Sequence, residues 1–186
     1  KNMSTENVEV RDKSKTKDMP GKSNYAPPIE KETRFAVVMY GGISLAIYIH
    51  GVAQELYHMV RATARKLDNE FEYLLDEDDK TFTAGERVYR KLGETLKTKF
   101  VVDILSGTSA GGLNAVFLAK AIANNRSMDF VKEFWVREGD ISVLLNDKDS
   151  LNGLSGLSLK DEALGLMNSQ RFYYKLLEAL MKMGSG

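Results

Sequence analysis

The stretch VVDILSGTSAGGLNAVFLAKAIA, residues 101–123, decides how this chain folds. The short apolar run Phe100–Leu105 predicts a strand, and the small residues Ser106–Ser109 predict a turn. Ala110–Ala123 is rich in alanine and leucine and predicts a helix that two asparagines close. A strand, a tight turn and a helix in this order are typical of α/β proteins.

An earlier stretch, RFAVVMYGGISLAIYIHGVAQEL at residues 34–56, has the same organisation. The apolar run Phe35–Tyr40 stops at Gly41 and Gly42, which predicts a strand buried on both faces, and a helix is expected from Ile43 to about residue 65. Two such units predict an α/β layered fold with a mainly parallel sheet. Because two strands are too few for a stable parallel sheet, we expect further strands from sequence outside these 186 residues.

The chain divides into three parts by composition. Residues 1–33 are polar and include Pro20, Pro27 and Pro28, so we expect a disordered tail. Residues 34–183 should form one domain or part of one, and residues 184–186 read as a linker or a truncation scar. Helical spacing predicts further helices at about 84–97, 129–137 and 169–183, and Ser158 with Asp161 predicts a capping box.

Charge and cysteine content exclude several classes of function. Lys plus Arg equals Asp plus Glu at 26 each, so no overall positive field would attract nucleic acid, and lipid contact would need local apolar surface. The chain has no cysteine, which excludes disulfides, cysteine-ligated zinc and thiol catalysis, and is compatible with a cytoplasmic location. The acidic run 76–79 lacks the ligand spacing of a calcium site and predicts an exposed loop.

The pattern G-x-S-x-G occupies Gly107, Thr108, Ser109, Ala110 and Gly111, after a predicted strand and at the start of a predicted helix. A sharp turn there would strain the serine backbone and raise its hydroxyl, while the two outer glycines would let strand and helix pass closely. The amino end of the helix would direct N–H groups toward a developing oxyanion. The alternative is a glycine-rich helix entry that only packs tightly.

A serine nucleophile needs a base, and the histidines do not supply an obvious one. His50 and His58 are the only two, and both precede Ser109, whereas an α/β hydrolase has the order Ser, acid, His. They lie eight residues apart on one predicted helix, too far to share a metal ion on one turn. We expect both to be helix-face or core residues.

The turn at Gly41, Gly42, Ile43 and Ser44 is the second candidate feature. Glycines between a buried strand and a helix leave bare N–H groups that an anion can approach, as in an oxyanion hole or a phosphate cradle. The turn lacks the G-x-G-x-x-G of dinucleotide sites, and no G-x-x-x-x-G-K-[ST] occurs in the chain.

Residues 34–56 and 101–123 together resemble the patatin-like phospholipase family, in particular a bacterial patatin-related subgroup with the loop G-G-[IV]-S-L-A. The segments at 89–92 and 171–180 are also similar. The resemblance implies a three-layer α/β/α sandwich and a lipid acyl hydrolase with a Ser–Asp dyad and no catalytic histidine. It also implies no metal or organic cofactor, and a lipid or phospholipid substrate at a membrane surface.

By position, Ser109 matches the family nucleophile, and the backbone N–H groups of Gly41, Gly42 and Ile43 match the oxyanion loop. The commoner family loop has a third glycine and an arginine, where this chain has Ile43 and Leu45. The family aspartate lies in an Asp-Gly motif, and these 186 residues contain no Asp-Gly dipeptide. The chain therefore resembles the N-terminal part of a patatin-like domain whose aspartate is not included.

Three other interpretations stay open from the sequence. Ser109 could belong to an ordinary α/β hydrolase whose histidine and acid lie beyond residue 186, or the fold could serve as an inactive interaction domain. Phe35–Ala53 contains 19 residues without Asp, Glu, Lys or Arg, near the length that spans a bilayer, although Gly41 and Gly42 interrupt it. The apolar segments 141–145 and 151–159 could line an acyl channel, form a cover or pack in the core.

Overall fold

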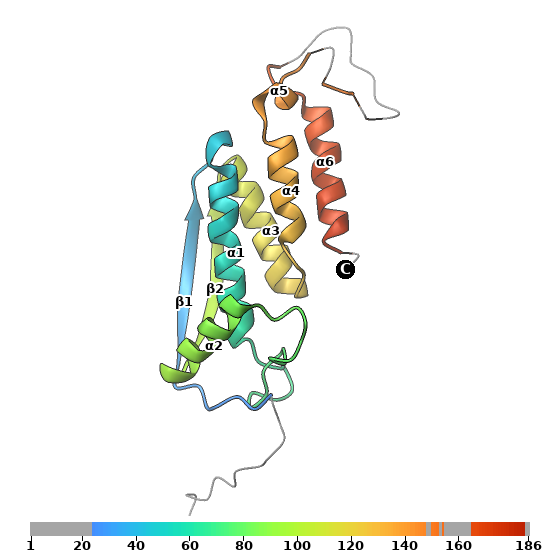
Figure 1. Ribbon diagram of the computed structural model, residues 1–186. Helices are drawn as coiled ribbons and strands as arrows, with labels where there is room; N and C mark the ends of the chain where they lie inside the picture. The colour runs from blue at the N-terminus through green and yellow to red at the C-terminus, as the bar shows by residue number, and fades with distance from the viewer. Residues whose placement is uncertain (1–23, 148–149, 153, 155–164, 185–186) are drawn as a thin grey trace, which may run out of the picture.

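The structure is a computed structural model that describes residues 24–147, 150–152, 154 and 165–184 (Figure 1). Among these residues it contains two strands, one 3-10 turn and six α-helices. In chain order the elements are β1 (Lys31–Met39), η1 (Ile43–Leu45), α1 (Ala46–Thr63), α2 (Ala84–Thr95), β2 (Thr98–Gly107), α3 (Ala110–Asn124), α4 (Asp129–Glu138), α5 (Ile141–Leu144) and α6 (Ser169–Lys182).

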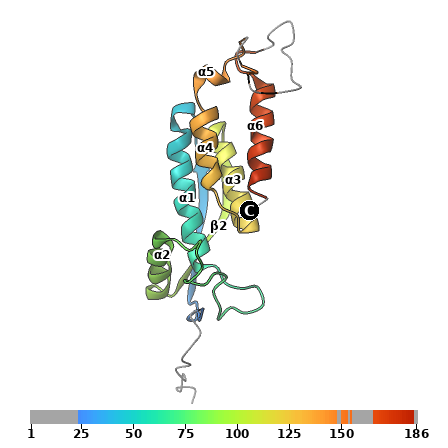
Figure 2. The same ribbon diagram turned by 45° about the vertical axis from the view of Figure 1, so that its right-hand side comes forward.

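β1 and β2 form a parallel sheet, paired from Lys31 with Thr98 to Met39 with Gly107. α1 and α3 cover one face of this sheet, α4 packs against α1, and α6 packs against α4 (Figures 1 and 2). The expected α/β fold with parallel strands is therefore present. The register shifts by one residue between Phe35 and Ala36, and both strands then end at paired residues, so both strand-to-helix turns lie at the same edge of the sheet.

Burial alternates along β1, so the prediction of a first strand buried on both faces is wrong for the described residues. Phe35 and Val37 face the helices, whereas Val38 on β1 and Ile104 on β2 are 61% and 60% exposed. No described element packs on the second face, where Arg34 donates two hydrogen bonds to Asp103. Helices on one face give the alternating pattern of a half-covered sheet.

The expected boundary of the polar tail at residue 33 is also wrong. β1 begins at Lys31, and Ala26 is fully buried with its N–H donating to the carbonyl of Phe71 at 2.9 Å. Backbone hydrogen bonds to distant residues order this segment: the N–H of Glu30, for example, donates to the carbonyl oxygen of Lys97. The segment is therefore ordered although its composition is polar. Residues 1–23 and the expected capping box at 158–161 lie outside the described residues.

The main hydrophobic core lies between α1, α3, α4 and α6 and includes Met39 at the end of β1. The Phe134 ring contacts three other aromatic rings. Its centroid lies 5.7 Å from that of Phe117, 5.0 Å from that of Trp135 and 5.9 Å from that of Phe172. Edge-on and tilted aromatic pairs of this kind add to the stabilisation from burial alone. Helices far apart in the sequence are thereby joined into one unit beside the sheet.

α2 is held to α1 by buried charges. Thr83 and Glu86 form a capping box, and the buried Glu86 carboxylate lies 3.1 Å from Arg61 and 3.2 Å from His58. Burial raises the pKa of Glu86, but the nearby His58 ring, the hydrogen bond from the Thr83 N–H and the charge of Arg61 outweigh burial, so the pKa is lowered. The buried Arg90 donates to the carbonyls of Ala62 and Leu75 and anchors the intervening loop.

Among the described residues, no helix combines the length and the apolar character needed to cross a membrane. The uncharged stretch Phe35–Ala53 is divided between β1, η1 and the first part of α1.

The buried imidazole of His50 predicts a loss of stability in mild acid. His50 is 2% exposed, neither ring nitrogen has a hydrogen-bond partner among the described residues, and burial lowers its pKa, outweighing the opposing effect of Asp129. Because the unfolded chain binds the proton more readily, stability should fall as the pH drops below about 6.5, by at most ~1.4 kcal/mol per pH unit. Urea unfolding at pH 7.5 and 5.5 measures this loss.

A His50→Leu variant should show a smaller loss between these pH values than the parent protein. The two proteins differ only at residue 50, so the difference between their losses reports on His50. Equal losses in the two proteins would contradict this assignment to His50.

Candidate functional site

The turn between β2 and α3 holds Ser109 in a strained conformation. Its backbone has φ 50° and ψ −127°, a region that residues with a side chain rarely adopt, and the residue is exposed. The strand ends at Gly107 and the helix begins at Ala110, so the serine occupies the bend itself. The strained, raised serine geometry that the G-x-S-x-G pattern predicts is therefore present.

The two outer glycines of the pattern are required by close packing. A Cβ atom on Gly107 would lie 2.6 Å from the carbonyl carbon of Gly111, and a Cβ on Gly111 would lie 2.2 Å from the carbonyl oxygen of Met39. Real Cβ atoms do not approach other atoms so closely. The expected close passage of strand and helix is confirmed, and the end of β1 takes part in it.

The glycine turn after β1 lies directly against the serine turn. A Cβ on Gly41 would be 2.5 Å from the carbonyl oxygen of Thr108 and 2.7 Å from the Cβ of Ser109. The N–H of Thr108 donates to Met39 O, and the N–H of Gly41 donates to the Thr108 hydroxyl, each at 3.2 Å. Gly42 has φ 142°, which favours glycine. The structure thus brings the two predicted features together.

The N–H groups around Ser109 are not all available to a ligand. Gly41 was expected to contribute an oxyanion donor, but its N–H already donates to Thr108. In the described part of the chain, the N–H groups of Gly42, Ile43 and Ala110 have no acceptor. Ala110 was expected only as part of the turn, yet the residue after the serine supplies a donor in G-x-S-x-G turns, so the motif itself carried this signal.

Asn114 joins the beginnings of the two helices that leave the site. Its fully buried side-chain amide donates to Ala46 O at 3.2 Å and to Ala110 O at 3.1 Å. Its side-chain oxygen accepts a hydrogen bond from the indole N–H of Trp135 at 2.9 Å. Asn114 therefore fixes the glycine turn relative to Ser109. The sequence signal was a polar amide within the apolar first half of a helix, one turn after Ala110.

The histidines are structural, as expected. His50 is buried between α1 and α4, and Nδ1 of His58 lies 3.2 Å from the Glu86 carboxylate. Within the described residues, no histidine or carboxylate hydrogen-bonds the Ser109 hydroxyl. The described residues thus place Ser109 beside backbone N–H donors. They do not include a group in position to act as a base for the Ser109 hydroxyl.

Exposed apolar side chains lie in and beside the glycine turn. Tyr40 and Tyr48 are 78% and 71% exposed, and other exposed large apolar residues lie on the glycine turn and the first turn of α1, namely Ile43, Leu45 and Ile47. Several exposed large apolar residues close together in the sequence favour contact with a ligand, a partner or a lipid surface. We call these five residues the apolar rim.

The short helix α5 lies in the segment 141–145, which was expected to line an acyl channel, form a cover or pack in the core. Of its residues, only Leu144 is buried.

Comparison with known proteins gives one informative relative. The chain is 32% identical over 162 residues to the uncharacterized membrane protein Rv3479 of Mycobacterium tuberculosis. The alignment covers 85% of this chain and 14% of that protein, so the chain spans about one seventh of its length. No protein-family model matches the chain, and no solved structure matches it.

The packing at Gly111 predicts a large penalty for one methyl group. Gly111→Ala should lower the free energy of unfolding by about 1–3 kcal/mol or more, because the added Cβ meets the Met39 carbonyl and backbone must move. Gly51→Ala is the matched control: it lies inside α1 with nothing within 4 Å, so it should raise stability by about 0.5–1 kcal/mol. Urea unfolding measures both, and equal effects would show that the turn is not closely packed.

Proposed function

We propose that this chain is the nucleophile-bearing part of a serine-dependent lipid acyl hydrolase of the phospholipase A type, related to patatin-like phospholipases. The observation that carries the proposal is the contact between the two turns: the exposed, strained Ser109 lies against a glycine turn. A structural turn has no need of strain and exposure at a serine, whereas a nucleophile does.

The free N–H groups beside Ser109 support stabilisation of an oxyanion. Gly42, Ile43 and Ala110 each have an N–H without an acceptor in the described chain, and the last stands at the positive end of α3. Donors fixed in place before the reaction lower the energy of the tetrahedral intermediate, and losing one typically costs about 10²–10³-fold in rate. The oxyanion hole we propose therefore uses these three residues, with Gly41 holding the turn in position.

The proposed reaction proceeds through an acyl-enzyme. A base accepts the Ser109 proton as Oγ attacks the ester carbonyl carbon, and the carbonyl oxygen becomes the oxyanion. Collapse of this intermediate breaks the ester bond, and the leaving alcohol takes the proton from the base. Water then attacks the acyl group with the help of the same base and releases the fatty acid and free Ser109. No metal or organic cofactor enters these steps.

We propose that the base is an aspartate outside these 186 residues, forming a Ser–Asp dyad. The chain contains no Asp-Gly dipeptide, and no described carboxylate or histidine hydrogen-bonds Ser109. His50 and His58 have other structural positions, so neither supplies the base, and the aspartate is proposed from the resemblance to patatin-like phospholipases. The 186 residues alone should therefore hydrolyse esters poorly.

The apolar rim supports a lipid as the substrate. Its five residues lie in and next to the glycine turn, which itself lies against Ser109, so an acyl chain would meet apolar surface as its ester approached the serine. Two exposed tyrosines are suited to the interface between water and lipid, where one end of the ring is apolar and the other polar. We propose peripheral contact with a membrane surface from the cytoplasmic side.

Labelling with a fluorophosphonate probe tests the nucleophile. In the native polypeptide that contains this chain, the probe should label Ser109, as located by mass spectrometry, because the raised hydroxyl attacks phosphorus. Ser109→Ala should abolish labelling and phospholipid hydrolysis, whereas Ser106→Ala, at an exposed serine on β2, should leave both unchanged. An unlabelled but folded protein would favour an inactive interaction domain, and labelling at another serine would refute the site.

Gly42→Ala tests the oxyanion donors separately. Alanine has room here, with the nearest atom 3.6 Å away, but it disfavours φ 142°, so the turn should rotate and misdirect the N–H groups of Gly42 and Ile43. We expect kcat for a fluorogenic phospholipid to fall about 10²–10³-fold. Ser44→Ala, in the same turn, should change kcat little. Equal kcat values for Gly42→Ala and the parent protein would remove these N–H groups from the mechanism.

A further inference from the structure

A second cleft lies at the end of the molecule opposite Ser109. It has a volume of about 460 Å³, within the size range of small-molecule sites. Its walls come from the second half of α1, the loop before α2, the α3–α4 connection and the end of α6. In Figure 1 these segments meet at the end where α3 finishes and the chain terminates. We call this the distal cleft; α3, about 22 Å long, separates it from Ser109.

Two buried donors in the wall of the distal cleft have no partner among the described residues. Tyr57 is 3% exposed, and its hydroxyl makes no hydrogen bond; Nε of the nearly buried Arg61 makes none either. Burial raises the pKa of Tyr57, so its phenol keeps the proton and can donate it. Buried polar groups are nearly always paired, and an unpaired one costs about 1–3 kcal/mol, so these two point to a ligand.

The charges around the distal cleft favour an anion. Arg61, Arg126 and Lys182 line it from three different segments, and the Arg126 side chain has no ion pair or hydrogen bond in the described chain. Arg61 also donates to Thr81 and pairs with Glu86, while Lys182 pairs with Glu178 at 2.8 Å. Arg126 is therefore the lining cation that has no carboxylate partner in the described chain, and its charge is available to an anion.

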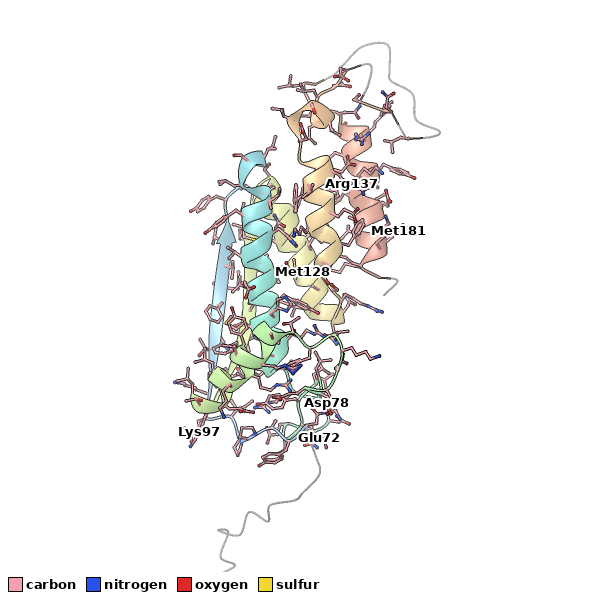
Figure 3. All side chains as sticks on the ribbon, viewed as in Figure 1. Glu72, Asp78, Lys97, Met128, Arg137 and Met181 are labelled. Carbon is pink, nitrogen blue, oxygen red and sulfur yellow. The ribbon has the colours of Figure 1, made fainter. Side chains whose placement is uncertain are left out.

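Those carboxylates, Asp79 and Asp129, already accept other hydrogen bonds. Asp79 accepts from the N–H and hydroxyl of Thr81, and Asp129 accepts from Gln54 and Ser127. These two carboxylates therefore lower the positive potential of the cleft. Because their oxygens already accept hydrogen bonds, they do not form a ready site for a cation. In Figure 3, Asp78 marks the loop that carries Asp79 at this end of the molecule.

One wall of the distal cleft is apolar. The Lys182 ammonium lies 4.4 Å from the centroid of the Phe130 ring. Leu75 and Met183 also line the cleft. A ligand with an apolar group beside its anionic head would bury both parts.

We propose that the distal cleft binds a phosphate monoester that carries an apolar group, with Tyr57, Arg61 and Arg126 donating hydrogen bonds to the phosphate. Three terminal oxygens match donors arriving from several directions better than the two oxygens of a carboxylate do. The same head could belong to a soluble metabolite or to a lipid. The site is independent of the proposed hydrolase activity, since it shares no residue with the Ser109 turn.

Calorimetric titration of the purified protein with n-hexyl phosphate, inorganic phosphate and hexanol tests the site. We expect hexyl phosphate to bind more tightly than inorganic phosphate, and hexanol not to bind. Tyr57→Phe and Arg126→Gln should each weaken hexyl phosphate binding about tenfold or more. Arg137→Gln is the control, because that exposed arginine pairs with Glu133 outside the cleft. Tyr57→Phe should not lower the melting temperature, because the lost hydroxyl has no partner.

Cosedimentation with phosphatidylcholine vesicles, with and without phosphatidic acid, distinguishes the source of the phosphate. Binding only to vesicles with phosphatidic acid, lost in Tyr57→Phe and Arg126→Gln, identifies a lipid head; binding of hexyl phosphate alone identifies a soluble ligand. The proposal fails if neither probe binds, if hexanol binds as well as hexyl phosphate, or if both variants bind like the parent protein.

Discussion

The close approach of two backbone turns is the constraint on which the rest of this structure depends. β1 and β2 end in register, so both chains must reverse into helices at the same edge of the sheet. Gly111 lies against the Met39 carbonyl and Gly41 against Ser109, at distances that admit no Cβ. The exposed serine and the free N–H groups of the neighbouring turn can lie side by side only because these positions lack side chains.

Polar bonds then hold the two turns in one arrangement. The Thr108 hydroxyl accepts the Gly41 N–H, and the buried Asn114 amide joins the first residues of α1 and α3 while Trp135 holds its oxygen. The Asn114 and Trp135 side chains are buried, where an unmade hydrogen bond is costly. The site therefore rests on α4 as well as on the sheet, although α4 contributes nothing to its surface.

The sequence predicted the local elements well because their signals are local. Apolar runs ended by glycines located both strands, and G-x-S-x-G located the strained serine. Burial was predicted poorly: an unbroken apolar run in β1 indicated two covered faces, but Val38 is exposed, since burial depends on which elements pack on the sheet. The capping box at Thr83 was visible in the sequence and missed, whereas the use of the Gly41 N–H and the pairing of residues 24–33 depend on distant partners.

The central claim concerns geometry at Ser109, and a crystal structure of the protein after reaction with a phosphonate would test it most directly. The account predicts a covalent bond from Ser109 Oγ to phosphorus, with the phosphonyl oxygen about 2.7–3.1 Å from the backbone nitrogens of Gly42, Ile43 and Ala110. A phosphonyl oxygen directed to solvent, or held by other groups while these three N–H groups stay unbound, would contradict it.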